Sequence, residues 1–507
     1  MNQEEKQALL EILSQITPGD AAAESEQNTL EDFLPLKDYQ QVVAPKNFVI
    51  LGDRGAGKTK LFNALNESNG YASIYHNVSS KSLLPDPEKI RFAVGYRERT
   101  SDFPSQVHCD MCVHDEHQIT AFWLGCMCFV VFHEFHDTIE IQTAAERYFA
   151  PEFLHLLQSF SNLSHVQKWL PIFETQIVDG ESFLDDVERY LMAEKRWFVL
   201  CYDGLDMVSS NYDKLLLFIR VLLQFWSSHN RRWKYLCAKI FLRTDLYDHP
   251  KIREFPDSSK ITGFSVELKW TSRTLYQLLI KRFANCKCDT NGLAIAYIQK
   301  ISDRMLVKSD TKELGWLPTD NSELHKSFID TLIGKYMGNN PKKGASYTWV
   351  PNHIQDANGN CAPRAFLKCF MLAADSMLQH PEEIGKLTEE HLLTPSVIQS
   401  AMVGVSKDRV AEICESYRWL KKLQDMLTGL QLLATQEEFL DRIDMGTWTE
   451  QEQKLLPGEQ KRDILEFLCT IGIIYYASDG RINVPEIYLH GFSMVRKGGL
   501  KKYKEDD

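Results

Sequence analysis

The sequence predicts an α/β fold built on a parallel sheet, and two observations carry this prediction. Short apolar runs alternate with helical patterns between residues 46 and 265, as in strands that are buried on both faces and joined by helices. A glycine-rich loop joins the first of these runs to a helical pattern. The chain of 507 residues is 44% hydrophobic and 25% charged, the ordinary composition of a folded globular protein with about two to four domains.

The strand candidates of this sheet are residues 48–51 (FVIL), 197–202 (WFVLCY) and 239–242 (KIFL). Each is a short apolar run of the kind found in buried parallel strands. Residues 71–78 are a further candidate. Most of the long stretch from about 90 to 195 is helical in pattern, so we expect a helical insertion within the sheet domain.

The remaining segments divide the chain into four parts. Residues 1–45 predict a short amphipathic helix followed by a polar, acidic linker. Residues 46–265 contain the sheet, and residues 266–380 are rich in helical patterns. Residues 381–507 begin as a helical segment and end in a compact module.

Charge and cysteine content exclude several classes of protein. The formal net charge is −12, so the chain as a whole does not attract nucleic acid or anionic membranes, and such binding needs a local basic patch. Twelve cysteines are too few for a disulfide scaffold. The first residues do not resemble a signal peptide, and the longest apolar run, residues 121–132, is well short of the ~20 residues of a membrane span. We therefore expect a cytoplasmic protein that does not cross a membrane.

The glycine-rich loop matches the phosphate-binding motif G-x-x-x-x-G-K-[ST] in full. Glycines let the backbone N–H groups point at phosphate oxygens, and the helix that follows adds its dipole. The lysine reaches the β- and γ-phosphates, and the threonine hydroxyl holds Mg²⁺. The motif therefore predicts a P-loop NTPase core that binds a nucleoside triphosphate with Mg²⁺ through Gly52, Asp53, Arg54, Gly55, Ala56, Gly57, Lys58 and Thr59.

Two further strands of the sheet end in polar residues. Asp203 follows residues 198–202 and is expected to act on Mg²⁺, while Asp206 is expected to orient or deprotonate the attacking water. The alternatives are a turn aspartate for Asp203 and a helix N-cap for Asp206. Arg243 and Thr244 end the next strand and are candidates to contact the γ-phosphate or the water. The alternative for this pair is a surface ion pair with Asp245.

Together these residues resemble the ASCE division of P-loop ATPases. The DGLD sequence at the acidic strand is similar to the signal-transducing (STAND) branch, and the whole pattern is also similar to origin-recognition-like AAA+ proteins. The segments FSVELKW and LYQLLIKRF resemble the passage from the last strand to a helical lid, which the resemblance places at residues 266–380. The segment NCAPRAFLKCF (360–370) resembles a sensor-2 motif of such a lid. Among these relatives, the chain most resembles bacterial P-loop ATPases of phage-defence neighbourhoods.

This resemblance implies ATP as the ligand, Mg²⁺ as its metal, and assembly with further copies or with an effector protein. It also implies that Arg364 contacts the γ-phosphate from the lid; a surface arginine is the alternative, and Arg282 is a weaker rival. The chain departs from the family because no glutamate follows Asp203 and Met207 follows Asp206. We therefore expect slow hydrolysis or none, and a nucleotide-dependent switch of conformation or assembly.

Two further features leave alternatives open. Cys109 and Cys112 have the C-x₂-C spacing of a zinc site, and His114 and His117 follow closely. Four zinc ligands within nine residues are sterically awkward. The alternative is a loop at the start of a helix with incidental Cys and His residues. Near the C-terminus, a helix over 461–473 and two strands around the turn 478–480 predict a winged-helix-like module. This module is expected to bind either protein or DNA, the latter with the basic residues Arg496, Lys497, Lys501, Lys502 and Lys504.

Three functions follow from these observations. The first is the ATP-dependent switch described above, in the antiviral setting that the resemblance implies. The second is an ATP-dependent DNA-binding or DNA-loading protein of the origin-recognition type. The third is a scaffold that binds a nucleotide without hydrolysing it.

Overall fold

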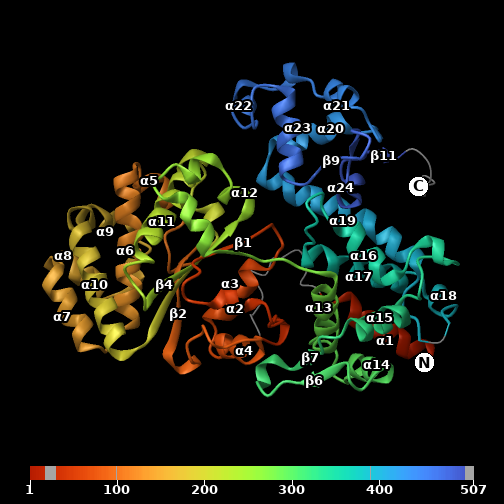
Figure 1. Cartoon of the computed structure of the whole chain (residues 1–507), viewed down its shortest axis with the longest axis horizontal. Helices are drawn as coiled ribbons and strands as arrows, with labels where there is room; N and C mark the ends of the chain where they lie inside the picture. Colours follow the sequence, from red (N-terminus) through yellow and green to blue (C-terminus); the bar gives the residue numbers. More distant parts are fainter. Residues whose placement is uncertain (17–29, 99, 389, 497–507) are drawn as a thin grey trace. The chain divides into compact units, whose positions relative to one another are not determined.

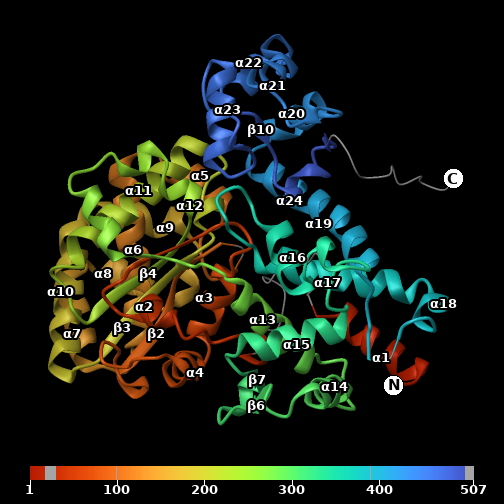
Figure 2. The same ribbon diagram turned by 45° about the vertical axis from the view of Figure 1, so that its right-hand side comes forward.

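A computed structural model describes residues 1–16, 30–98, 100–388 and 390–496 of the chain (Figures 1 and 2). These residues fall into two compact units. We call the first the sheet unit; it comprises residues 21–268 and 311–314 within the described ranges. We call the second the helical unit; it comprises the described parts of residues 1–20, 269–310 and 315–507.

The sheet unit contains a five-stranded sheet with the order β2-β3-β4-β1-β5, and every pairing in it is parallel. The predicted strands at 48–51, 197–202 and 239–242 are confirmed. β4 lies between β1, which leads into the glycine-rich loop, and β3, which ends in Asp203. The strands are β1 (Val49–Gly52), β2 (Ile90–Arg97), β3 (Trp197–Asp203), β4 (Leu236–Arg243) and β5 (Ser265–Glu267).

Two predictions for this region are wrong in detail. The strand candidate at 71–78 is a helix, α4 (Gly70–Asn77), in which Tyr71 and Ile74 are buried at helical spacing. The helical insertion predicted from residue 90 starts later, because Ile90–Arg97 is the edge strand β2. Gly95 allows the close approach of β2 to β3, since a Cβ at this position would lie 2.9 Å from the Tyr202 ring.

Helices cover both faces of the sheet (Figures 1 and 2). On one face lies α3 (Lys58–Asn66), whose Phe62 meets Phe241 of β4 edge to face, with ring centroids 5.8 Å apart. The opposite face is covered by α6 (Glu116–Glu134) and α11 (Tyr212–His229). The other helices of the sheet unit are α2 (Tyr39–Val43), α4, α5 (Gln106–Cys112), α7 (Ile139–Tyr148), α8 (Pro151–Leu157), α9 (Val166–Phe173), α10 (Ile177–Glu194) and α12 (Thr244–Tyr247).

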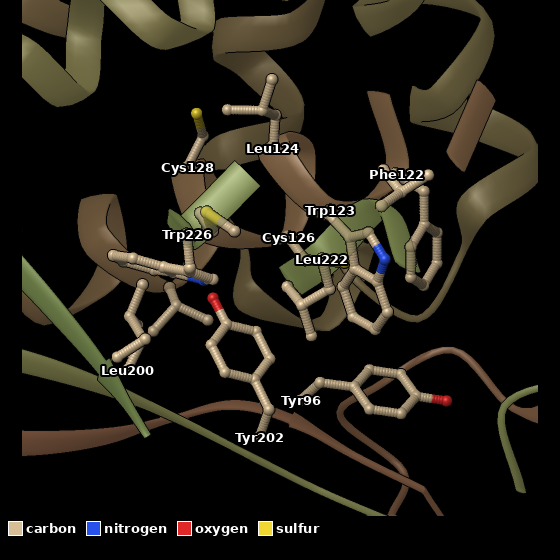
Figure 3. Packing of buried hydrophobic residues seen from close by; sticks show 14 of the residues in the cluster. Tyr96, Phe122, Trp123, Leu124, Cys126, Cys128, Leu200, Tyr202, Leu222 and Trp226 are labelled. Carbon is tan, nitrogen blue, oxygen red and sulfur yellow. The ribbon is translucent and has the colours of Figure 1, made fainter. Parts of the chain in front are cut away.

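Aromatic side chains fill the space between the sheet and α6. Figure 3 shows Tyr202 of β3 among Trp123 of α6 and Trp226 of α11, and the ring centroids of these two tryptophans lie 6.0 and 6.3 Å from that of Tyr202. The Trp123 indole N–H is satisfied because it donates to the Phe218 carbonyl at 2.9 Å. This packing fixes β3, and therefore Asp203 at its end, relative to the insertion.

The apolar run at 121–132 is an interior helix. All twelve of its residues, within α6, are buried, because α7, α8, α9, α10 and α11 surround this helix. A helix that is apolar on all sides is expected when it is enclosed by other elements. None of the helices in the described residues is long and apolar enough to cross a membrane.

Gly125 of α6 provides a test of this packing. A Cβ at Gly125 would lie 2.4 Å from the Trp169 ring, and Trp169 is fully buried. We expect Gly125→Ala to lower the free energy of unfolding by about 1–3 kcal/mol, as overpacked cores do. Gly263→Ala is the matched control, since nothing lies within 4 Å of its Cβ position. Denaturant unfolding of both variants checks this, and wild-type stability of Gly125→Ala would contradict it.

The helical unit begins with α1 (Gln3–Ser14), which packs against α17 (Pro363–Leu378). Its first half also contains a two-stranded antiparallel ribbon, β6 and β7. Its remaining elements up to the long helix α19 are α13 (Ser272–Ala284), α14 (Leu293–Ile301), β6 (Leu306–Lys308), β7 (Trp316–Pro318), α15 (Ser322–Leu332), α16 (Ser346–Ile354), α18 (Pro381–Ile384) and α19 (Pro395–Ser416).

The C-terminal part of the helical unit contains the predicted helix and hairpin. The helix is α23 (Lys461–Thr470), and the antiparallel pair β9 and β10 follows it. Ala434 forms an antiparallel bridge with Ile482 of β10, so a third segment joins the hairpin. The elements are α20 (Trp419–Leu427), β8 (Gln431–Leu432), α21 (Gln436–Arg442), α22 (Glu450–Gln453), α23, β9 (Tyr475–Tyr476), β10 (Ile482–Asn483), α24 (Glu486–Leu489) and β11 (Val495–Arg496).

Candidate functional site

The glycine-rich loop curls tightly between β1 and α3. Gly55 and Gly57 have φ angles of 82° and 92°, in the left-handed region that favours glycine. A Cβ at Gly52 would lie 3.0 Å from the Ala56 Cβ, so the loop closes on itself. The N-cap of α3 is Gly57, which has no side chain to cap the helix, and a helix N-terminus of this kind favours an anion.

Lys58 lies across the inside of this loop. Its ammonium donates to the carbonyl oxygens of Gly52 at 2.7 Å and Asp53 at 3.0 Å. Burial lowers the pKa of Lys58, while the charges of Asp203 and Asp206 act in the opposite direction. A partly buried ammonium that donates to neutral carbonyls is well suited to bind phosphate oxygens.

Asp203 is brought to the loop by β3, although β3 and β1 are not neighbours in the sheet. The side chain is buried, with 6% of its residue surface exposed. Burial raises the pKa of Asp203, and a hydrogen bond from the Thr59 hydroxyl, the charge of Lys58 and the Gly204 N–H all lower it. The threonine hydroxyl and the carboxylate therefore touch, and both are oxygen ligands of the kind Mg²⁺ takes.

Asp206 lies in the turn Leu205–Met207 that follows β3, and its side chain is 39% exposed. It does not cap the helix ahead. Asn211 is the N-cap of α11, and its side chain accepts the Lys214 N–H at 3.1 Å. The N-cap alternative for Asp206 is therefore wrong. Its carboxylate instead lies 3.6 Å from Arg243 Nη1.

Arg243 joins two carboxylates at the end of β4. Its Nε and Nη2 atoms donate to Asp245 at 3.0 and 2.6 Å, while Nη1 faces Asp206. The sequence left open a surface ion pair between Arg243 and Asp245. The ion pair is present but largely buried, and Arg243 also contacts Asp206. The charge of Asp245 also raises the pKa of Lys58, so Asp245 belongs to the site. Its position two residues after a strand-end arginine was the only signal for it in the sequence.

Thr244 is the first residue of α12. Its hydroxyl oxygen is buried, and among the described residues no hydrogen-bond partner satisfies it. A buried hydroxyl next to Arg243 remains compatible with the predicted contact to a ligand.

Arg364 is the second residue of α17, after Pro363, so the predicted helix start is confirmed. Its guanidinium pairs with Glu412 of α19 at 3.2 Å, and the arginine side chain is 43% exposed. Both residues belong to the helical unit. Contact of Arg364 with the γ-phosphate stays a prediction.

The Cys–His segment spans two helices: Cys109 and Cys112 lie in α5, His114 lies between the helices, and His117 is in the first turn of α6. Cys109 is fully buried, and burial raises the pKa of its thiol to about 12. In the described part of the chain, no group of three or more His, Cys, Asp or Glu residues could hold a metal ion. These findings agree with the helical alternative.

The basic residues of the C-terminal module are largely engaged. In the turn of the hairpin, Arg481 donates to Asp479 at 2.8 and 2.6 Å. Arg496 donates to the Val484 carbonyl at 2.7 Å and lies 3.7 Å from Glu486. The other basic residues predicted for DNA contact, Lys497, Lys501, Lys502 and Lys504, lie outside the described residues.

The residues at the carboxyl edge of the sheet fit a nucleoside triphosphate with Mg²⁺. The left-handed glycines form a cradle for phosphates, the ammonium of Lys58 donates to carbonyls within this loop, and Thr59 and Asp203 present adjacent oxygens. With this loop, strand and helix, the sheet unit is an α/β P-loop NTPase core.

Comparisons with known proteins add little to this description. No protein-family model matches the chain, and no curated protein matches it in sequence. Among solved structures, the ORC2 protein of Aeropyrum pernix, in ADPNP–ADP complexes, is similar at 12% sequence identity over 90% of this chain and 91% of that chain. The TM-score of 0.29 is too low to show a shared fold, so neither fold nor function is inferred from it.

Proposed function

We propose that the protein binds ATP with Mg²⁺, hydrolyses it slowly, and changes conformation or assembly with the nucleotide state. One observation carries this proposal: Lys58, Thr59, Asp203, Asp206 and Arg243 meet at one edge of the sheet, although they come from three separate stretches of the chain. These are the residue types that phosphoryl transfer requires.

Each residue has a chemical role in this proposal. Lys58 neutralises charge on the β- and γ-phosphates, while Thr59 and Asp203 hold Mg²⁺, which supplies further charge neutralisation when bound. Asp206 orients the attacking water and accepts its proton. No glutamate follows Asp203, which leaves Asp206 as the proposed base, and we therefore expect slow turnover.

The switch is tested by measuring the size of the purified protein with ADP, ATP and a slowly hydrolysed ATP analogue, with and without DNA. ATP and the analogue are expected to change the hydrodynamic size or mass, and ADP is expected not to. Equal behaviour with all three nucleotides would leave a nucleotide-bound scaffold. Failure to bind any of them would reject the proposal.

The DNA-loading alternative depends on the C-terminal module. Residues 419–507 contain twelve Lys and Arg and fifteen Asp and Glu, and among the described residues Arg481 and Arg496 are paired with carboxylates. A helix followed by an antiparallel hairpin suits a winged-helix module. Salt-dependent DNA binding by the full chain would favour this alternative. The antiviral setting rests on the sequence resemblance alone.

Arg364 tests whether the lid reads the γ-phosphate. We expect Arg364→Ala to leave ADP affinity within about 3-fold of wild type and to weaken the ATP-induced change in size or mass. Lys368→Ala is a matched control, because Lys368 lies one turn along α17 and pairs with Asp408 of the same helix that holds Glu412. Calorimetric titration with both nucleotides measures this. Equal loss of ATP and ADP affinity in Arg364→Ala would indicate a structural role.

A further inference from the structure

The carboxylate of Asp110, in α5, accepts hydrogen bonds from the loop that carries Asp206. One of its carboxylate oxygens accepts the Ser209 hydroxyl, and the other accepts the Ser210 N–H at 3.0 Å and the Ser210 hydroxyl at 2.6 Å. Burial alone would raise the pKa of Asp110, but these bonds and the charge of Lys214 hold it below its usual value. We call Asp110 with its two serine partners the Asp110 clamp.

A second set of bonds fixes the clamp to the next helix. Lys214, in the first turn of α11, donates to the carbonyl oxygens of Cys109 at 2.8 Å and Asp110 at 3.0 Å. These carbonyls lie near the C-terminal end of α5, where a cation is favourable. The Ser209 hydroxyl also accepts the Asn211 N–H at 3.2 Å. The end of the loop and the start of α11 are therefore held together by α5.

The loop from Asp203 to α11 is thus fixed at both ends. At its start, β3 and the Thr59–Asp203 contact hold the chain. At its end, the Asp110 clamp holds Ser209, which is itself 4% exposed. Asp206 lies between the two anchors, three residues from each. The two anchors restrict the backbone that carries Asp206, and Arg243 contacts its carboxylate from β4.

We propose that Asp110 is a positioning residue for Asp206 in ATP hydrolysis. The inference rests on the proposed function, because it needs a reaction in which Asp206 takes part. It explains why an aspartate stands between Cys109 and Cys112: an ionised carboxylate accepts several hydrogen bonds, whereas the amide of asparagine would turn two donors toward Ser209 or Ser210.

The test compares Asp110→Asn with a carboxylate that performs a similar task elsewhere. Glu188 of α10 accepts the N–H groups of Lys234, Tyr235 and Leu236, at the amino end of β4. Both Asp110→Asn and Glu188→Gln are expected to lower the melting temperature. Only Asp110→Asn is expected to slow single-turnover hydrolysis at saturating ATP, by roughly 10- to 100-fold, since a displacement of about 1 Å has effects of this size. Its ATP affinity is expected to stay within about 3-fold of wild type.

A double-mutant cycle identifies the residue through which Asp110 acts. In the Asp206→Asn background, Asp110→Asn is expected to cause no further loss of hydrolysis, because the carboxylate that it positions is gone. Independent, multiplicative losses would overturn the inference, and so would hydrolysis by Asp110→Asn at the wild-type rate. A wild type that binds ATP but never hydrolyses it would overturn it as well. A wild type that binds no ATP would reject the proposed function itself.

Discussion

Lys58→Ala is expected to lose ATP affinity by roughly 100-fold or more. The ammonium is partly buried inside the loop, where it donates to two backbone carbonyls, and its removal takes away the cation expected to contact the β- and γ-phosphates. Hydrogen bonds between charged groups contribute about 1.5–3 kcal/mol each, and at least two are lost. Titration calorimetry with ATP and Mg²⁺ measures the affinity, and turnover falls with it.

The control for Lys58 is a lysine of the same unit that lies away from the loop. Lys234 precedes β4 at the amino edge of the sheet, and its ammonium lies over the Tyr235 ring. Lys234→Ala is expected to bind ATP as the wild type does. A melting curve for each variant separates lost affinity from lost folding. Wild-type ATP binding by a folded Lys58→Ala variant would falsify the assignment of the phosphate-binding loop.

The parts of the site that could be predicted are those formed by residues adjacent in the sequence. The loop at 52–59 and the strands before Asp203 and Arg243 show their apolar runs and polar ends directly. Parallel pairing then brings the carboxyl ends of β1, β3 and β4 to one edge. Once the strands are recognised, the meeting of Lys58, Asp203 and Arg243 follows from topology.

The parts that could not be predicted depend on contacts between distant residues. Asp110 and Ser209 are 99 positions apart, and the sequence draws attention to the cysteines beside Asp110 rather than to Asp110 itself. The edge strand β2 was hidden because it adjoins a long helical stretch. The second carboxylate on Arg243 could not be foreseen, since the geometry of a turn decides whether Asp206 faces forward to α11 or back to β4.

Asp206→Asn is expected to keep ATP bound and to slow its hydrolysis by roughly 10²–10⁴-fold, the range that general bases contribute. The carboxylate acts on the water mainly in the transition state, so its loss changes turnover more than affinity. Such a variant accumulates in the ATP state, and any assembly that ATP promotes is expected to persist. Single-turnover hydrolysis and the size of the protein with ATP measure the two consequences.

The effects of Asp206 substitutions on stability and on hydrolysis are expected to separate. Because Asn211 caps α11, removal of Asp206 leaves the helix start intact, and the side chain is too exposed for its pairing with Arg243 to contribute much stability. We therefore expect both Asp206→Asn and Asp206→Ala to melt close to the wild type while both lose hydrolysis. Asp245→Asn is an informative companion, because it frees Arg243 from its bidentate partner without removing the proposed base. If hydrolysis survives in both Asp206 variants but falls in Asp245→Asn, the reaction depends on the Arg243–Asp245 pair and Asp206 is not the base; if it survives in all three, neither Asp206 nor this pair is needed.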